Sequence, residues 1–193
     1  MNISSVPADS SALTNIAKAC GADKAEPIMT ESIEFSVEFK NLCRSNSCGK
    51  YGSNWMCPPG VGPIEEQIAR VRPYRQGIVI QNISQLEDSF DFEGMESALD
   101  RHDSIFRRIR DLVQAEFKGE DILFLSAGAC TICERCTYLD KEPCMFPDLA
   151  IPPIESYGID VYKVLHSSGL QYNNGKDTVS YVGLILFDHQ DPG

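Results

Sequence analysis

Seven of the eight cysteines in this chain fall into two tight groups separated by an ordinary globular stretch. The first group is Cys43, Cys48 and Cys57, and the second group is Cys130, Cys133, Cys136 and Cys144. Cysteine thiolates hold zinc and iron-sulfur clusters in proteins, so cysteines at short spacing indicate metal binding. The sequence therefore predicts two metal-binding loops.

The second group has the spacing of a four-thiolate cage. Three cysteines recur at every third residue in Cys-Thr-Ile-Cys-Glu-Arg-Cys, and a fourth follows after a short loop in Glu-Pro-Cys-Met-Phe-Pro. This spacing is typical of a loop that wraps a cubane 4Fe-4S cluster. Structural zinc is the alternative, but zinc sites normally use two Cys-x2-Cys pairs with a longer spacer between them.

The first group has only three cysteines, so it is one ligand short of a closed site. A cubane held by three thiolates leaves one iron with an exchangeable position, and an open position permits Lewis-acid chemistry. A fourth ligand from Cys20, a histidine or a carboxylate would instead close the site and leave electron transfer as its role. One assembly shared by both groups is a further alternative.

The other residues that could take part in metal chemistry are scattered. Cys20 stands alone on a short apolar segment and is expected to be a buried structural thiol. His102 falls on an apolar helical face, which favours a core position, whereas His166 is the better ligand candidate and His189 lies near the end of the chain. Trp55, the only tryptophan, is expected either to shield a metal centre from water or to pack in the core.

Both cysteine groups are predicted to begin where a strand ends. Residues 33–39 alternate apolar and polar side chains, which is the period of a half-buried strand, and lead directly into Cys43. Residues 121–126 are short and apolar, which predicts a buried strand, and the small residues 127–129 then open into the second group. Ligands on loops after strand ends combine a rigid scaffold with reach.

The remaining elements alternate between helices and strands. Pro63 marks the first turn of a helix that runs to Val71. Apolar residues at steps of three and four predict a long amphipathic helix over residues 92–117. The other expected elements are strands over residues 77–83 and 179–187 and helices over residues 154–157 and 161–166. This order predicts a single α/β domain over residues 31–190, a layered sheet with helices, after a loosely ordered lead-in over residues 1–30 with a short helix around residues 12–20.

Length and composition limit the classes of protein to consider. A chain of 193 residues forms a sizeable core without disulfides, and its N-terminal residues have no apolar signal-peptide core. No apolar run approaches the length of a membrane span, so we expect a soluble cytoplasmic protein. The net charge of −11 disfavours a nucleic acid partner. The expected partner is a redox protein or a small-molecule substrate, and nothing in the sequence indicates an oligomeric state.

The chain resembles the family of predicted metal-binding proteins grouped as domain of unknown function 2284, over residues 35–187. The resemblance rests on four strings: Cys48-Gly-Lys-Tyr-Gly-Ser-Asn-Trp-Met-Cys57-Pro-Pro, Gly128-Ala-Cys130-Thr-Ile-Cys133-Glu-Arg-Cys136, Pro143-Cys144-Met-Phe-Pro147 and Ile154-Glu-Ser-Tyr-Gly-Ile-Asp160. It implies a metal-binding, iron-sulfur protein. The second group is separately similar to bacterial ferredoxins, although Met145 and Phe146 replace the proline that directly follows the cysteine in that pattern.

Together these observations predict an α/β iron-sulfur protein of an oxygen-avoiding microbe with a redox function. Cys130, Cys133, Cys136 and Cys144 are predicted to hold one 4Fe-4S cluster, and Cys43, Cys48 and Cys57 a second centre. One alternative is an enzyme that uses an open iron of the three-cysteine centre to bind a small anionic or sulfur-containing substrate. Another is a zinc-stabilised interaction module.

Overall fold

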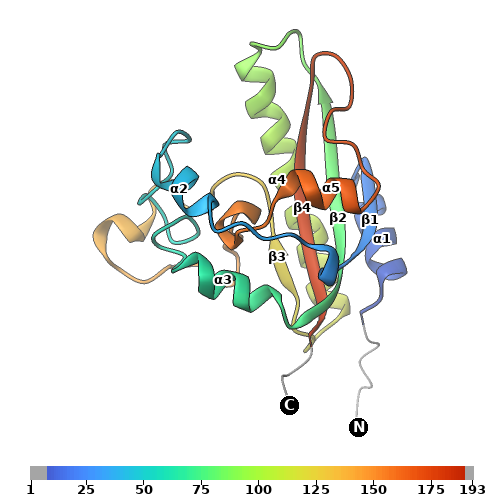
Figure 1. Cartoon of the computed structure of the whole chain (residues 1–193), viewed down its shortest axis with the longest axis horizontal. Helices are drawn as coiled ribbons and strands as arrows, with labels where there is room; N and C mark the ends of the chain where they lie inside the picture. The colour runs from blue at the N-terminus through green and yellow to red at the C-terminus, as the bar shows by residue number, and fades with distance from the viewer. Residues whose placement is uncertain (1–7, 190–193) are drawn as a thin grey trace.

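Four strands form one antiparallel sheet in the order β1-β2-β4-β3 (Figure 1). The structure, a computed structural model, describes residues 8–189, without the side chain of His189. The strands are β1 (Lys24–Met29), β2 (Tyr74–Gln85), β3 (Leu123–Leu125) and β4 (Thr178–His189). The two long strands β2 and β4 pair along almost their whole length, with β1 on one edge and the short β3 on the other. The β2–β4 pair is therefore the scaffold of the domain.

Helices cover both faces of this sheet. They are α1 (Ser10–Ala19), α2 (Phe39–Arg44), α3 (Ile64–Val71), α4 (Phe92–Glu116) and α5 (Val161–Ser167), with 3-10 turns η1 (Thr30–Ser32), η2 (Thr137–Asp140) and η3 (Ile154–Tyr157). Apolar side chains of α1 and α4 pack on one face, and those of α3, η3 and α5 pack on the other. This arrangement confirms the predicted single α/β domain with a layered sheet. None of these helices is both long and apolar enough to cross a membrane.

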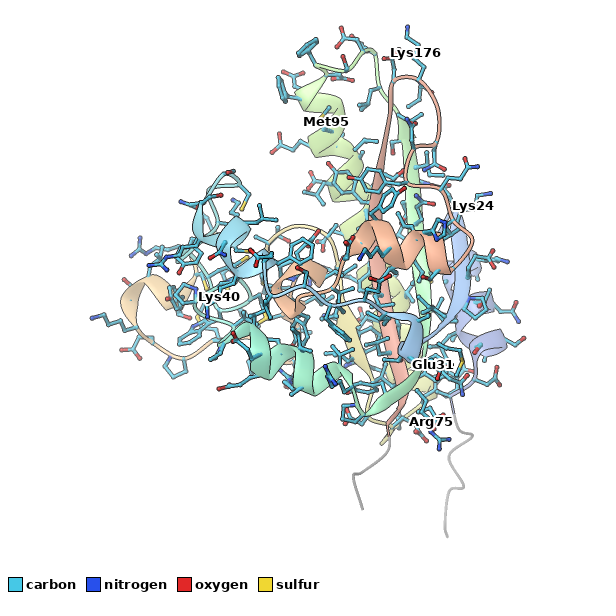
Figure 2. The ribbon with its side chains drawn as sticks, in the orientation of Figure 1. Lys24, Glu31, Lys40, Arg75, Met95 and Lys176 are labelled. Atoms are coloured by element: carbon cyan, nitrogen blue, oxygen red, sulfur yellow. The ribbon has the colours of Figure 1, made fainter. Side chains whose placement is uncertain are left out.

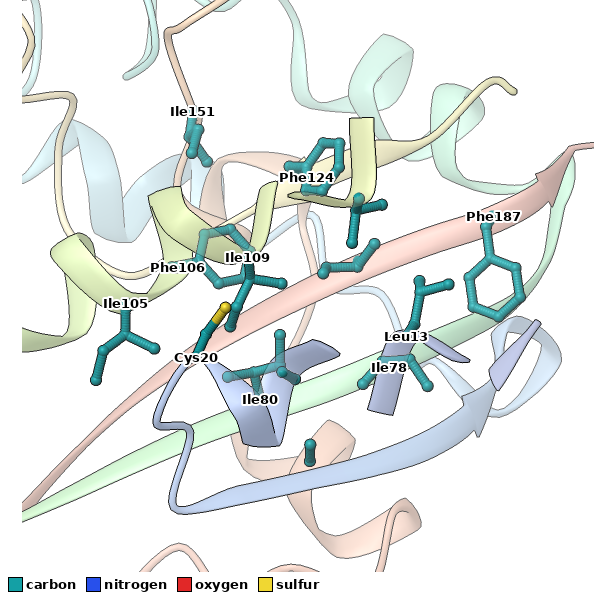
Figure 3. Packing of buried hydrophobic residues seen from close by; sticks show 14 of the residues in the cluster. Leu13, Cys20, Ile78, Ile80, Ile105, Phe106, Ile109, Phe124, Ile151 and Phe187 are labelled. Carbon is teal, nitrogen blue, oxygen red and sulfur yellow. The ribbon is translucent and has the colours of Figure 1, made fainter. Parts of the chain in front are cut away.

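The core follows the two-residue period of the central strands. Along β4, Ile185 and Phe187 belong to the cluster under α1 and α4, part of which is shown in Figure 3. Leu184 and Leu186 belong to the cluster on the opposite face. The α4 helix lies so close to β4 that a Cβ added at Gly183 would overlap the ring of Phe106. Burying each such large apolar side chain contributes about 1.5–3 kcal/mol.

The long amphipathic helix is confirmed as α4, but its first turn does not reach the core. The side chain of Asp91 caps the helix by accepting a hydrogen bond from the N–H of Gly94 at 2.8 Å. Phe92 is 73% exposed, and this start of α4 lies on the side where Met95 is labelled in Figure 2. The buried face begins at Ala98 and continues to Val113.

The predicted strand over residues 33–39 is wrong. Only one bridge forms in this segment, between Phe35 and Ile159, and the Ser36 N–H donates to Gly158 O at 2.7 Å. The segment therefore pairs with the turn after η3 rather than with a strand of the sheet, and Val37 is 51% exposed. Helix α2 then begins at Phe39, so the first cysteine group starts on a helix and not at a strand end.

Among the described residues, the N-terminal segment is part of the fold, in place of the expected loose lead-in, of which residues 1–7 lie outside the described residues. The expected short helix is present as α1, and it buries Leu13 and Ala17 against the sheet. Strand β1 follows, so the predicted domain boundary at residue 31 lies after an edge strand of the sheet. Sequence reasoning missed β1 because Pro27 interrupts it, and proline is tolerated in a strand mainly at a sheet edge.

His102 is buried in a polar network between α4 and the sheet. Its Nδ1 lies 2.8 Å from Asn82 Oδ1 and its Nε2 lies 3.2 Å from Ser126 Oγ. Asn82 Nδ2 donates to the Gly21 carbonyl, so the Oδ1 of Asn82 faces the His102 ring. The Nδ1 of His102 therefore carries the proton, and its Nε2 accepts a hydrogen bond from the Ser126 hydroxyl. Burial lowers the pKa of His102 to about 4. The expected core role of His102 agrees with this position.

Candidate metal site

The second cysteine group follows the end of β3, as the sequence predicts. Ser126 forms a single bridge with Pro153 directly after the strand, and the chain then leaves the sheet. All four cysteines of this loop border one small cavity. In Figure 2 the two cysteine loops lie on the side of the molecule where Lys40 is labelled. The other residues around this cavity are mainly apolar: Trp55, Met56, Ile132, Thr137, Phe146 and Ala150.

A tight reversal brings Cys144 back to the other three thiols. Cys136 precedes η2, and the turn ends at Lys141, which has a left-handed backbone with φ 59°. The Glu142 N–H donates to Thr137 O at 3.1 Å, and the Thr137 hydroxyl donates to Pro143 O at 2.9 Å. These bonds close a loop between the third and fourth cysteines, so the short spacer returns the chain to the cavity.

The first group lies on α2 and on the loop between α2 and α3. Cys43 is half-buried on α2, Cys48 is exposed and Cys57 is 7% exposed. The buried side chain of Asn54 fixes Cys57, since its Oδ1 accepts the N–H groups of Met56 at 3.0 Å and of Cys57 at 2.9 Å. An asparagine that bonds the backbone in this way forms an Asx turn. The position of the Cys57 thiol is therefore set by the fold.

Helix α3 anchors the far end of the same loop. Gln67 is 3% exposed, and its Nε2 donates to Val61 O at 2.8 Å. The Val61 N–H in turn donates to Cys57 O at 3.1 Å. Sequence reasoning missed Gln67, although its place on the apolar face of α3, one residue before Ile68, was a signal that it is buried for a reason.

Trp55 joins the two cysteine loops. Its Nε1 donates to Glu142 O at 3.1 Å, and its ring meets the edge of Tyr138 with the centroids 5.0 Å apart. Trp55 and Glu142 lie 87 residues apart in the chain. Of the two roles expected for Trp55, its position in the wall of the thiol cavity agrees with shielding of the second group.

The thiols of the two groups are also electrostatic neighbours. Burial raises the pKa of Cys57, the Asn54 side chain opposes this effect, and nearby Cys48, Cys43 and Cys130 raise the pKa further. The influence of Cys130 on Cys57 means that the two groups adjoin each other in space.

Cys130 has a similar environment within its own group. Burial raises the pKa of its thiol, a hydrogen bond from the Ile132 N–H and the charge of Arg107 lower it, and Cys144 and Cys133 raise it. Thiols must lose their protons when they bind metal, so metal uptake at these cysteines is expected to release protons.

The donors of this site fit a thiophilic metal group. Thiolate ligands favour zinc, copper(I) and iron-sulfur clusters over hard cations such as magnesium. Within residues 8–189, however, no three histidine, cysteine, aspartate or glutamate side chains are arranged to hold a single metal ion. The thiols therefore surround a shared space without converging on one point.

The model of a known protein family matches residues 26–187, which is most of the chain, and this family is described as predicted metal-binding protein, DUF2284. The chain belongs to this family. The resemblance found in the sequence is thereby confirmed. Comparison with curated proteins and with solved structures gave no match.

In this member of the predicted metal-binding family, Glu155 lies beside the first cysteine group. It is half-buried on η3 and borders, together with Cys43, a cavity of about 290 Å³. Burial raises the pKa of Glu155, and the charge of its carboxylate contributes to the raised pKa of Cys43, for which burial is the largest cause. Sequence reasoning quoted this residue within a motif but did not place it beside the first cysteine group.

The other candidate ligands lie elsewhere. Cys20 is buried in the core beside Ile80 and Ile109, as expected for a structural thiol (Figure 3). His102 is held by its hydrogen bonds between α4 and the sheet, and the His189 side chain lies outside the described residues. His166 is exposed near the end of α5. Among the fourth ligands considered for the first group, the structure thus brings a carboxylate beside Cys43.

Proposed function

We propose that this protein binds a 4Fe-4S cluster through Cys130, Cys133, Cys136 and Cys144 and transfers electrons to a redox protein or a small-molecule substrate. The observation that carries this proposal is the single cavity bordered by all four thiols. Its other walls are mainly apolar, and walls of this kind limit solvent access, which is one of the ways a protein controls a cluster's potential.

The spacing of the four thiols in the sequence supports a cluster over zinc. A zinc ion needs all four sulfur atoms about 2.3 Å from one point. In a cubane each thiolate binds a different iron, so the sulfurs are spread around a larger group. The spacing of Cys130, Cys133, Cys136 and Cys144 is typical of a loop around a cubane, and all four residues border the same small cavity.

Two groups next to Cys130 are suited to tune such a cluster. The Ile132 N–H donates a hydrogen bond to the thiol, and the charge of Arg107 favours the thiolate. Arg107 is itself held by Asp103 at 2.8 Å and by Leu149 O at 3.1 Å. Hydrogen bonds and positive charge near the sulfurs raise the reduction potential by stabilising the more negative, reduced state.

Iron and acid-labile sulfide content of protein purified without oxygen tests this proposal. We expect a brown protein with about four irons and four sulfides for the Cys130 group. Cys136→Ala should lose them, whereas Cys20→Ala, which removes the buried thiol outside both groups, should keep them. A colourless protein that contains zinc without iron or sulfide would overturn the proposal and support the zinc-stabilised interaction module.

We further infer that the first group holds a second centre, with Glu155 as the fourth ligand beside Cys43, Cys48 and Cys57. Carboxylates ligate iron as well as zinc, and η3 fixes this one against the cavity that Cys43 borders. A closed four-ligand centre suits electron transfer, whereas a three-thiolate centre would leave an open iron for catalysis.

Glu155→Gln tests this ligand, because the amide keeps the shape of the side chain but is a much weaker ligand. We expect the electron paramagnetic resonance signal of the first group to change or disappear while the signal of the Cys130 group persists. Glu134→Gln, at an exposed carboxylate beside Cys133, is the control and should change neither signal. If Glu155→Gln leaves both signals intact, Glu155 is not a ligand of the first group, and the open iron position of the enzyme alternative gains support.

A further inference from the structure

A large cleft of the described structure adjoins the second cysteine group. Its volume is about 670 Å³, within the range of small-molecule sites. Trp55, Met56 and Cys144 border both this cleft and the thiol cavity, while residues of α3, α4 and β3 form its other walls. A molecule in the cleft would therefore lie directly beside one of the four thiols.

The charged residues of this cleft contrast with the rest of the chain. Arg70, Arg110 and Lys141 line it together with a single acid, Asp148. The chain has 28 acidic and 17 basic residues, so its overall field repels anions. Three cations around one cleft of such a chain form a local site for negative charge.

Arg70 and Lys141 are the cations best placed to meet a ligand. Arg70 Nη1 donates to Gln67 Oε1 at 3.1 Å, and its guanidinium lies 5.6 Å from the centre of the Tyr157 ring. Both contacts orient the group without neutralising its charge. Neither Arg70 nor Lys141 has a carboxylate within 4.0 Å among the ion pairs of residues 8–189.

Arg110 is a fixed part of the wall. Its side chain is 5% exposed, its Nη2 lies 2.6 Å from Asp111 Oδ1, and its Nη1 donates to Leu149 O at 2.7 Å. Asp111 neutralises much of the charge of Arg110, and Asp148 offsets part of the remaining positive charge, so the net positive charge of the cleft comes from Arg70 and Lys141.

We propose that this cleft binds a small anion with at least two oxygen acceptors, a carboxylate or an oxyanion, next to Cys144. The planar guanidinium of Arg70 matches such a group in a forked arrangement, and Lys141 adds a mobile point charge. The Trp55 and Pro143 side chains supply apolar wall for the remainder of the ligand. This site goes beyond the proposed cluster and does not depend on it, because the cations carry the binding.

Isothermal titration calorimetry of the anaerobically purified full chain tests the proposal. Succinate and inorganic phosphate serve as probes of the two anion types, and neutral succinamide is the control ligand. We expect one of the anions to bind at low ionic strength and to bind more weakly as salt is added, with no heat from succinamide. Trp55 lies in the cleft and is the only tryptophan, so the same titration should change its fluorescence.

Arg70→Gln and Lys141→Asn should each weaken binding about tenfold or more, as expected for loss of a charge-assisted hydrogen bond. Asparagine is chosen at 141 because it tolerates a left-handed backbone. Arg72→Gln is the matched control, since this exposed arginine lines a different cleft. Iron content, measured on every sample, separates failure of this site from failure of the cluster proposal. Absence of anion binding by the wild-type protein, or equal affinity in all three variants, would overturn the inference.

Discussion

Cys57→Ala is expected to remove one metal centre and to spare the other. Cys57 belongs to the first group, whereas the cavity of the second group is bordered by its own four thiols. Iron per chain should fall by the content of one centre, and the resonance signal of the Cys130 group should remain. Cys57 is 7% exposed, and Asn54 bonds both its backbone N–H and its thiol. Alanine removes only the thiol and keeps the backbone bond, so we expect the variant to retain a cooperative fold.

The position of Cys57 makes the opposite result informative. Its pKa is raised by Cys48 and Cys43 of its own group and also by Cys130 of the second group, so this thiol lies near both groups. Loss of all iron in Cys57→Ala, with circular dichroism unchanged, would contradict separate centres and favour one shared assembly. Cys48→Ala removes an exposed thiol of the first group and is the comparison variant. It distinguishes a specific role of Cys57 between the two groups from a general disruption of the first-group loop.

Acid should destabilise the fold through His102. Its folded-state pKa of about 4 lies below the ordinary value near 6.5, so the unfolded chain binds this proton more readily than the folded one. The stabilisation is complete above pH 6.5 and is lost as the pH falls toward 4. The free energy of unfolding should decrease by about 3 kcal/mol over this range because of this residue alone.

Denaturant unfolding of wild type and His102→Gln at several pH values between 4 and 8 measures this contribution. Glutamine does not titrate, so the difference in stability between the two proteins should shrink as the pH falls. Carboxylates and thiols titrate in both proteins and cancel in the difference. Two parallel stability curves would show that His102 keeps its ordinary pKa in the folded protein.

Sequence periodicity predicted the elements whose pattern is set by the core. Helix α4 was recognised from its apolar face and β4 from its run of apolar residues, because both pack against the sheet along most of their length. The segment 33–39 has an equally clear alternating pattern, but no strand lies beside it. Its pairing with Ile159 depends on η3, which is more than a hundred residues away, and local spacing contains no information about that neighbour.

The candidate site was likewise predictable from the sequence only in part. The cysteines and their grouping were visible in the sequence, and their role as ligands stays a prediction. The approach of Glu155 to Cys43, and the position of Arg70 near Cys144, required the three-dimensional structure. Each pair borders a common cavity although its members are far apart in the chain, and no short motif predicts this.

The hydrogen bond from Trp55 to the Glu142 carbonyl has a consequence for transplanting the ferredoxin-like segment. Residues 128–147 contain all four thiols of the second group, and a peptide of that length would keep their spacing. It would lack Trp55 and Met56, which form one wall of the thiol cavity and come from the other loop. The segment thus supplies only part of the wall of the thiol cavity, and rebuilding this cavity on a new scaffold would require residues 54–60 to be grafted with it.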